Sequence, residues 1–133
     1  MGFLFLTLDE VLVAHEEQIR LFGGASGIRD ASLLLSAMGN VEATFGGVFL
    51  HETIFEMGAA YLYGICRNHP FVDGNKRTAL SAALTFLDAN HIEVQADENE
   101  LVDLVISVAE GKISKAGVAV FLEDHSTGTP HRR

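Results

Sequence analysis

The sequence predicts a compact all-α bundle of about six helices, and three features of the chain support this prediction. Apolar residues recur mainly at helical spacing rather than in strand-like alternation. Residues typical of helix N-caps precede most of the apolar stretches, and glycine or proline follows several of them. The chain of 133 residues has the length of a single domain. We expect one domain over residues 1–124 and a flexible C-terminal tail over residues 125–133.

The first expected helix begins after Thr7 and ends at Gly23 and Gly24. Thr7 and Glu10 form a capping box, in which each side chain accepts a hydrogen bond from the other residue's backbone N–H. Apolar residues and one histidine share a single face of this segment, which we expect to point inward: Leu8, Val11, Leu12, His15, Ile19 and Phe22.

A second, shorter helix is expected from the N-cap residue Asp30 to Met38. Between Gly39 and Gly47 the chain contains three glycines among residues of mixed character. This composition is typical of a mobile loop or a small hairpin, and it argues against a helix.

Two further helices are expected, over residues 51–68 and from Asn75 or Lys76 to about residue 90. The first of them is apolar on several faces, which is usual for a helix at the centre of a bundle. His69 and Pro70 end it, because the residue before a proline is disfavoured in the α conformation.

The C-terminal part is expected to contain a short extended segment at residues 92–95 and two more helices. These helices span residues 98–110 and the stretch from the N-cap residue Ser114 to residue 123. The residues from His125 onwards are polar and include glycine and proline, so we expect them to fray.

The composition excludes several classes of protein. The net charge is −9 at pH 7, whereas a nucleic-acid-binding domain is normally basic. The single cysteine excludes an internal disulfide and a cysteine-rich zinc site. No apolar stretch reaches the roughly 18 residues of a membrane-spanning helix, and the N-terminal sequence lacks the basic flank of a signal peptide. We therefore expect a cytoplasmic protein with no direct nucleic-acid or membrane partner.

Residues 67–77 are the part of the sequence that points to a specific chemistry. Arg67, Lys76 and Arg77 are three of the nine basic residues in a chain that is otherwise acidic. Lys76 and Arg77 fall in the first turn of an expected helix, where the helix dipole disfavours cations. A bound anion would reverse this penalty, because helix N-terminal N–H groups and basic side chains together bind phosphate.

The residues between these cations are suited to form a stiff ligand-binding loop. Pro70 restricts φ, and Phe71 is an apolar residue between polar neighbours that can anchor the loop in the core. Gly74 allows a positive φ and a close approach of the backbone to a ligand. Asn75 can cap the following helix or bind a phosphate oxygen.

Two side chains of the same loop are suited to catalysis. Asp73 offers the kind of oxygen ligand that Mg²⁺ prefers, usually in combination with substrate phosphates. His69 can take a proton from an attacking hydroxyl near neutral pH. Each residue alone has a common structural explanation, but the whole set at this spacing favours a functional site.

This segment resembles the signature of the Fic superfamily, His-Pro-Phe-x-x-Gly-Asn-x-Arg, which lies in the loop between two central helices. The matching residues are His69, Pro70, Phe71, Gly74, Asn75 and Arg77. The stretch from Asp73 to Leu80 is similar to the Doc (death-on-curing) branch, and the resemblance extends to residues 23–24, 27–30 and 109–113. It implies a helical fold, the use of ATP with Mg²⁺, and transfer of part of ATP to a protein hydroxyl.

Two residues bear on which part of ATP is transferred. Adenylylating Fic proteins have a second glycine after the asparagine and a further arginine, and this chain has Lys76 and Leu80 at these positions. In Doc-type proteins this pattern accompanies ATP bound in the opposite direction, with its γ-phosphate presented. The resemblance therefore implies a protein kinase, with an AMP transferase as the alternative. A Fic-like binding module without catalysis is a second alternative, against which the intact His69 argues.

The resemblance also implies roles for the individual residues. Asp73 would hold Mg²⁺, and His69 would deprotonate a Ser or Thr hydroxyl of the target. Phosphate oxygens would be bound by Gly74, Asn75, Lys76, Arg77 and Arg67. Residues 39–47 lie where Fic proteins carry the flap that aligns the target segment.

The Doc branch further implies two protein partners. Its precedent for a target is a translation factor, elongation factor Tu, whose modification arrests translation. Many Fic proteins restrain themselves with a motif of Ser or Thr, three residues, and Glu followed by Gly or Asn. Glu98 and Glu110 have such a follower but no Ser or Thr four residues earlier. We therefore expect an antitoxin chain that supplies the inhibitory segment in trans.

Overall fold

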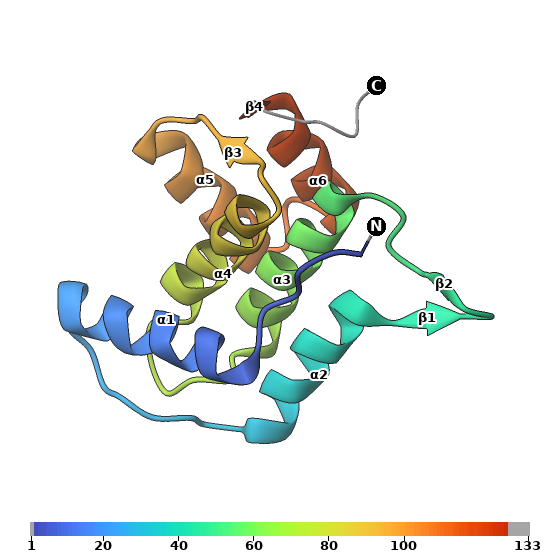
Figure 1. Ribbon diagram of the computed structural model, residues 1–133. Helices are drawn as coiled ribbons and strands as arrows, with labels where there is room; N and C mark the ends of the chain where they lie inside the picture. Colours follow the sequence, from blue (N-terminus) through green and yellow to red (C-terminus); the bar gives the residue numbers. More distant parts are fainter. Residues whose placement is uncertain (1, 128–133) are drawn as a thin grey trace.

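The computed structural model describes residues 2–127, which form six α-helices and four strands of two residues each (Figure 1). The helices are α1 (Leu8–Phe22), α2 (Ala31–Glu42), α3 (Ile54–Asn68), α4 (Asn75–Ala89), α5 (Glu98–Ala109) and α6 (Lys115–Asp124). The strands are β1 (Thr44–Phe45), β2 (Val48–Phe49), β3 (Glu93–Val94) and β4 (Ser126–Thr127). The all-α fold that the sequence predicts is confirmed. None of the helices within residues 2–127 is long and apolar enough to cross a membrane.

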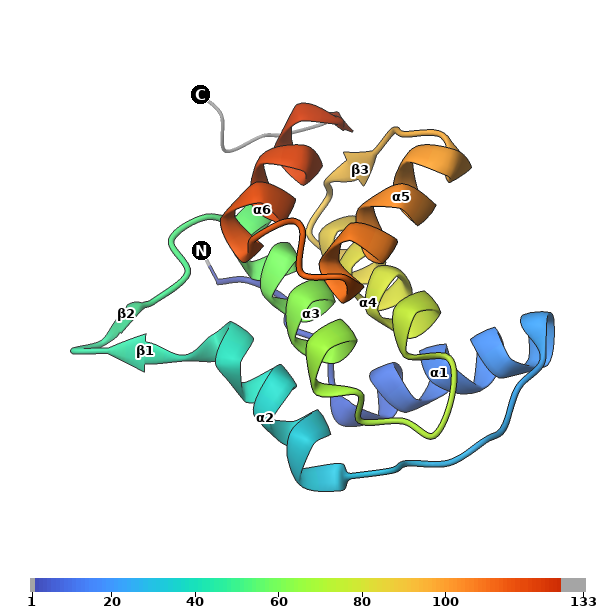
Figure 2. The same ribbon diagram turned by 180° about the vertical axis from the view of Figure 1, so that it is seen from behind.

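Helix α3 lies at the centre of the bundle, and α2, α4, α5 and α6 pack around it. Figure 2 shows the same arrangement from behind, with α1 crossing beside α4. Side chains on several faces of α3 are buried, as its apolar sequence predicts. The central helix therefore packs against each of these four helices, and α1 packs on α4.

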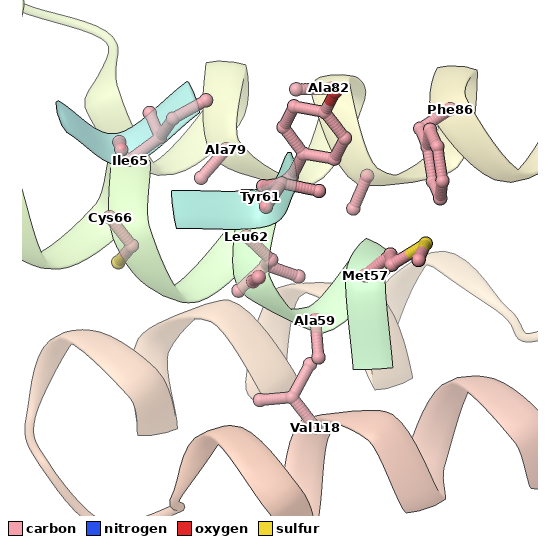
Figure 3. Packing of buried hydrophobic residues seen from close by; sticks show 14 of the residues in the cluster. Met57, Ala59, Tyr61, Leu62, Ile65, Cys66, Ala79, Ala82, Phe86 and Val118 are labelled. Atoms are coloured by element: carbon pink, nitrogen blue, oxygen red, sulfur yellow. The ribbon is translucent and has the colours of Figure 1, made fainter. Parts of the chain in front are cut away.

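The contact between α3 and α4 is close because small residues line it. Ala79 and Ala82 of α4 are fully buried and face α3 in Figure 3. At Gly58 of α3, an added Cβ atom would lie only 3.3 Å from the side chain of Leu87. This packing fixes α3 relative to α4, the two helices that residues 69–74 join.

Five helices in the described part of the chain begin with a side-chain N-cap, and α4 does not. The capping residues are Thr7, Asp30, Thr53, Asp97 and Ser114. Gly74, in the left-handed conformation with φ 76°, precedes α4 and offers no capping side chain. The start of α4 thus departs from the local rule that the other helices obey.

Helix α2 is longer than the sequence predicts, because it continues past Met38 to Glu42 and includes Gly39. Met38 and Val41 are both buried in the core. Burial of two large apolar side chains outweighs the roughly 1 kcal/mol by which an interior glycine disfavours a helix. Of the predicted loop or small hairpin at residues 39–47, a small hairpin is present, but it lies over residues 44–49, with Thr44 paired to Phe49.

The ends of α1 also differ from the prediction. Leu8 and Phe22 were expected to point inward, but they are 39% and 62% exposed. The middle of α1 packs on α4 through buried Val11 and His15, whereas its first and last turns extend beyond that contact. Helical periodicity predicts which face of a helix points inward. It does not predict how many turns of that face a neighbouring helix covers.

Residues 125–127, the first three of the expected tail, are held by hydrogen bonds. Ser126 and Thr127 form β4, which pairs with β3 in antiparallel register, and the carbonyl of His125 accepts a hydrogen bond from the N–H of Gln95 at 2.6 Å. Main-chain hydrogen bonds to β3 hold these polar residues. Because these residues have no apolar pattern, the sequence does not indicate this pairing. Residues 128–133 of the predicted tail lie outside the described residues.

Candidate active site

The loop that joins α3 to α4 begins at His69, an exposed residue at the C-terminal end of α3. The backbone of His69 is left-handed, with φ 50° and ψ 54°, and its N–H donates to the carbonyl of Ile65 at 3.3 Å. The chain thereby turns out of the helix and leaves the imidazole at the rim of the loop. Residues with a positive φ other than glycine are uncommon and cluster at functional sites.

Residues 27–30 run antiparallel to this loop and hold it by main-chain hydrogen bonds. The carbonyl of Pro70 accepts from the N–H groups of Arg29, at 2.7 Å, and Asp30, at 3.0 Å. The N–H of Val72 donates to the carbonyl of Gly27 at 3.0 Å, which completes a β-bridge between Ile28 and Phe71. The loop is therefore stiff because of a segment 40 residues away, besides the proline that the sequence indicates.

Phe71 anchors the loop in the core, as predicted, with only 1% of its surface exposed. The side-chain amide of Asn75 accepts from the N–H of Phe71 at 2.9 Å and donates to its carbonyl at 3.0 Å. Nδ2 of Asn75 also lies 3.5 Å from Nδ1 of His69. Asn75 is the first residue of α4 and does not cap it, because its amide closes the loop. Its predicted binding of a phosphate oxygen stays a prediction.

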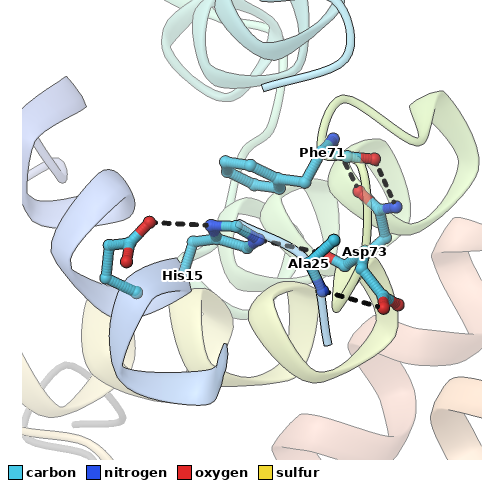
Figure 4. Close-up of polar contacts among 6 residues, drawn as sticks. His15, Ala25, Phe71 and Asp73 are labelled. Atoms are coloured by element: carbon cyan, nitrogen blue, oxygen red, sulfur yellow. Dashed lines mark hydrogen bonds and ion pairs between the residues drawn. The ribbon is translucent and has the colours of Figure 1, made fainter. Parts of the chain in front are cut away.

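His15 contacts two residues of the loop, Phe71 and Asp73 (Figure 4). It is a buried residue of α1, and its Nε2 lies 2.8 Å from the main-chain carbonyl oxygen of Asp73. Its ring stacks on Phe71, with ring centroids 3.9 Å apart and the planes 7° from parallel. The sequence places His15 on the inward face of α1, but nothing in it connects this residue to a loop 58 positions away.

The carboxylate of Asp73 is exposed and ionised. Its Oδ2 accepts from the N–H of Ala25 at 3.3 Å, and its Oδ1 accepts from the N–H of Gly74 at 2.9 Å (Figure 4). These two hydrogen bonds, and more weakly the charge of Arg77, hold the pKa of Asp73 below its ordinary value. Gly24 makes room for this arrangement, because a Cβ atom there would lie 2.6 Å from Oδ2 of Asp73.

Lys76 and Arg77 lie in the first turn of α4, as predicted. The side chain of Lys76 is exposed, and no side chain in the described part of the chain caps this end of the helix. Arg77 is half-buried, and its Nη2 donates to the carbonyl of Gly23 at 3.0 Å, with the guanidinium 5.2 Å from the ring centroid of Phe22. The first turn of α4 thus carries two cations and no side-chain cap, and the charge of Arg77 acts on Asp73.

Arg67 is also predicted to bind phosphate, and its side chain contacts residues outside the loop. Its Nη1 donates to the carbonyl of Val108 at 3.2 Å, near the end of α5. Its guanidinium also lies 5.8 Å from the ring centroid of Tyr63. The first contact ties the end of α3 to α5, and the second lies within α3, to which Tyr63 also belongs. Phosphate binding by Arg67 stays a prediction.

Together, the helical fold and the loop from His69 to Arg77 define a protein of the Fic type. The sequence matches the Fic/DOC family over residues 5–87, and the chain belongs to this family. It is 38% identical over 111 residues to the "Protein kinase doc" of Escherichia phage P1, covering 84% of this chain and 86% of that protein. It is 45% identical over 93 residues to the "Toxin Doc" of Mycolicibacterium smegmatis, covering 70% of this chain and 69% of that protein. The resemblance to the Doc branch is confirmed.

Proposed function

We propose that this chain is a Doc-type toxin that transfers the γ-phosphate of ATP to a Ser or Thr hydroxyl of a target protein. One of its relatives is named a protein kinase and the other a toxin, which supports a phosphotransferase paired with an antitoxin. The target we propose is a translation factor such as elongation factor Tu, so that the reaction arrests translation. A substrate of this kind places the reaction in the cytoplasm.

The observation that carries this proposal is the N-terminus of α4. Among the described helices it alone lacks a side-chain cap, and Lys76 and Arg77 occupy its first turn. The free N–H groups and the two cations all favour an anion at this place. Of the common intracellular anions, a triphosphate fits best because a carboxylate and an imidazole lie in the same loop.

Asp73 is the residue that would hold Mg²⁺. Each of its oxygens accepts one backbone N–H and keeps a further lone pair, and the lowered pKa keeps the carboxylate charged at neutral pH. Within residues 2–127 no three His, Cys, Asp or Glu side chains gather to hold a metal ion. A single carboxylate fits Mg²⁺, which typically binds one or two carboxylates together with substrate phosphates and water. Bound Mg²⁺ would neutralise part of the phosphate charge.

His69 is the general base of the proposed reaction. As the target oxygen forms its bond to the γ-phosphorus, the bond from that phosphorus to the β–γ bridging oxygen breaks and ADP leaves. The hydroxyl proton passes to the imidazole of His69, which is exposed at the rim of the loop. Lys76, Arg77 and the N–H groups of α4 stabilise the charge on the phosphoryl oxygens during transfer.

The side chains at positions 76 and 80 support phosphate transfer over AMP transfer. Lys76 places a side chain where adenylylating Fic proteins have an open glycine. Leu80 is half-buried and lines an apolar groove together with Leu21, Phe22 and Leu101, so this position offers no charge to a terminal phosphate. AMP transfer remains the alternative that the labelling experiment below separates.

The same groove is where we place the inhibitory segment of the antitoxin. It has a volume of about 500 Å³, lies between α1, α4 and α5, and includes Arg77 in its lining. Leu21 and Phe22 are 54% and 62% exposed beside it, so their apolar surface is open to a partner. A segment bound here reaches Arg77 directly and can compete with phosphate.

The test uses the purified protein with Mg²⁺, elongation factor Tu, and ATP labelled at either the α- or the γ-phosphate. We expect label on the target from γ-labelled ATP only. The variant His69→Ala should lose it by about 10²- to 10⁴-fold, the usual contribution of a general base. The matched control is His91→Ala, because His91 is also an exposed histidine with positive φ (70°) after a helix.

The outcomes of this test are distinct. Label from α-labelled ATP would mean that the protein is an AMP transferase. No label in elongation factor Tu or in a whole bacterial lysate would leave a binding module. Equal loss of label in the His69 and His91 variants would show that a general disturbance, and not the loss of a base, explains the effect.

A further inference from the structure

The end of α3 presents a structural problem that the loop itself does not solve. The last carbonyl groups of a helix have no partner within the helix. His69 also adopts the left-handed conformation, which costs about 1–2 kcal/mol for a residue with a Cβ atom. A contact from elsewhere must therefore hold His69 in this conformation.

Arg29 supplies that contact. Its Nε donates to the main-chain carbonyl of His69 at 2.7 Å, and its Nη2 donates to the carbonyl of Asn68 at 3.0 Å. The guanidinium is planar and presents these donors at fixed positions, so it binds both carbonyls only in one relative orientation. Its positive charge also complements the C-terminal end of the α3 dipole.

The backbone of Arg29 is itself held in place. Its N–H donates to the carbonyl of Pro70, the residue that follows His69. The next residue, Asp30, caps α2 through its carboxylate, which accepts from the N–H of Leu33 at 3.1 Å. Arg29 therefore links the start of α2 to the end of α3, and both its main chain and its side chain contact the loop.

We infer that Arg29 is a positioning residue for His69. It contacts the main chain of the base and of its neighbours, and it acts by keeping the His69 backbone left-handed, which sets the direction of the imidazole. The consequence for catalysis rests on the proposed function of His69 as the base. Displacement of a catalytic group by about 1 Å can lower a rate by about 100-fold, so the loss of Arg29 should be felt mainly in kcat.

The experiment compares Arg29→Ala and Arg29→Lys with the wild type by kinetics and by NMR. We expect kcat for γ-phosphate transfer to fall by about 10- to 100-fold in Arg29→Ala, while KM for ATP changes by less than about 3-fold. In ¹⁵N-labelled protein without nucleotide, the strong intraresidue amide-to-α-proton NOE of His69, diagnostic of a positive φ, should weaken. Arg29→Lys keeps a charge and one donor, so it should restore part of kcat.

The matched control is Arg20→Ala, which removes an exposed arginine that pairs with Glu17 on the same helix. This variant should keep both kcat and the His69 NOE. If Arg29→Ala does not fold, Arg29→Lys carries the test, with a smaller fall in kcat and the same NMR comparison.

Two results would overturn the inference. One is a kcat within 2-fold of wild type together with an unchanged His69 NOE in both Arg29 variants. The other is a raised KM for ATP at unchanged kcat, which would make Arg29 a nucleotide-binding residue. If the wild type transfers no phosphate, the proposed function fails, but the NMR comparison still decides whether Arg29 holds His69.

Discussion

The N-termini of α1 and α4 show two opposite ways to begin a helix in the same molecule. At α1, Thr7 and Glu10 satisfy each other's backbone N–H groups, and Asp9 adds a second acid to the first turn. At α4, Gly74 offers no side chain, and Lys76 with its neighbour supplies two cations where a helix favours acids. The first arrangement is complete within the chain, whereas the second leaves the first N–H groups of α4 without a side-chain cap.

The capped helix N-termini contribute to stability, whereas the uncapped N-terminus of α4 lies at the candidate site. Five helix starts in residues 2–127 follow the pattern of α1, so the chain is well able to cap a helix. The exception coincides with the loop that carries His69 and Asp73. A helix N-terminus that lacks the usual cap and carries cations is therefore a candidate ligand site, provided that chemically suited side chains surround it. Each prediction below tests whether the two kinds of helix start can be disturbed independently.

The largest effect is expected at Asp73. The variant Asp73→Asn keeps the shape of the side chain but removes the charge that would hold Mg²⁺, so phosphate transfer should fall by about 100-fold or more. The control is Asp97→Asn, because Asp97 caps α5 and asparagine caps a helix about equally well. Transfer should be measured at several Mg²⁺ concentrations. Equal activity of the two variants would contradict the assignment of Asp73.

A smaller effect is expected at Gly24. A Cβ atom in Gly24→Ala would meet Oδ2 of Asp73 at 2.6 Å, at a backbone φ of 113° that disfavours side chains. Stability should fall by about 1–3 kcal/mol, and transfer per folded molecule should fall as well because the carboxylate must move. Chemical denaturation and the transfer assay measure the two effects separately.

The control for this variant is Gly39→Ala. Gly39 lies within α2, and nothing lies within 4 Å of a Cβ atom added there. Alanine should therefore stabilise the protein by about 0.5–1 kcal/mol and leave transfer unchanged. A loss of transfer in Gly39→Ala, or none in Gly24→Ala, would refute the close contact between Gly24 and Asp73 as the cause.

The most direct test of the comparison pairs Thr7→Ala with Lys76→Ala. Loss of the Thr7 cap should lower stability by about 1 kcal/mol and leave transfer per folded molecule unchanged. Loss of Lys76 should lower transfer by about 10-fold and raise stability by a few tenths of a kcal/mol, because a cation leaves a helix N-terminus. The crossed pattern is measured by denaturation and by transfer in the same two proteins. If stability and transfer changed in the same way in both variants, the two helix N-termini would not differ in role.

Much of the fold is readable from the sequence because local rules determine it. The capping box at Thr7, the caps at Asp30 and Ser114, and the apolar faces predict where the six helices of residues 2–127 begin within a few residues. The predictions are wrong where contacts between residues far apart in the chain determine the secondary structure. Helix α2 continues through Gly39 because Val41 packs into the core, and β4 exists because β3 lies beside it.

The candidate site likewise has a part that the sequence predicts and a part that only the structure shows. The motif from His69 to Arg77 is contiguous, so its spacing alone identifies it. The residues that hold it are far apart in the chain: His15, Ala25 and Arg29 contact the loop across 40 to 58 positions. No local pattern distinguishes an arginine that binds two carbonyls from one in solvent, which is why Arg29 and His15 emerge only from the structure.

The smallest predicted effect concerns acid stability and compares the carboxylate of a cap with that of the loop. Hydrogen bonds from Ser32 and the N–H of Leu33 lower the pKa of Asp30, and hydrogen bonds from the N–H groups of Ala25 and Gly74 lower that of Asp73. A carboxyl group with a lower pKa in the folded state stabilises the protein above its unfolded pKa of about 3.9, and this stabilisation is lost as the pH falls below that value. The stability differences between wild type and Asp30→Asn or Asp73→Asn should therefore both shrink below about pH 4.

Mg²⁺ with ATP should then separate the two carboxylates. A ligand that binds only the folded protein raises its melting temperature, and near neutral pH this increase should persist in Asp30→Asn and vanish in Asp73→Asn. In the wild type, the increase should fade as the pH drops towards the pKa of Asp73, because the protonated carboxyl no longer holds the metal. Thermal melts from pH 3 to 7, with and without Mg²⁺-ATP, measure this. An increase that survives in Asp73→Asn would mean that the first turn of α4 binds phosphate without help from the loop carboxylate.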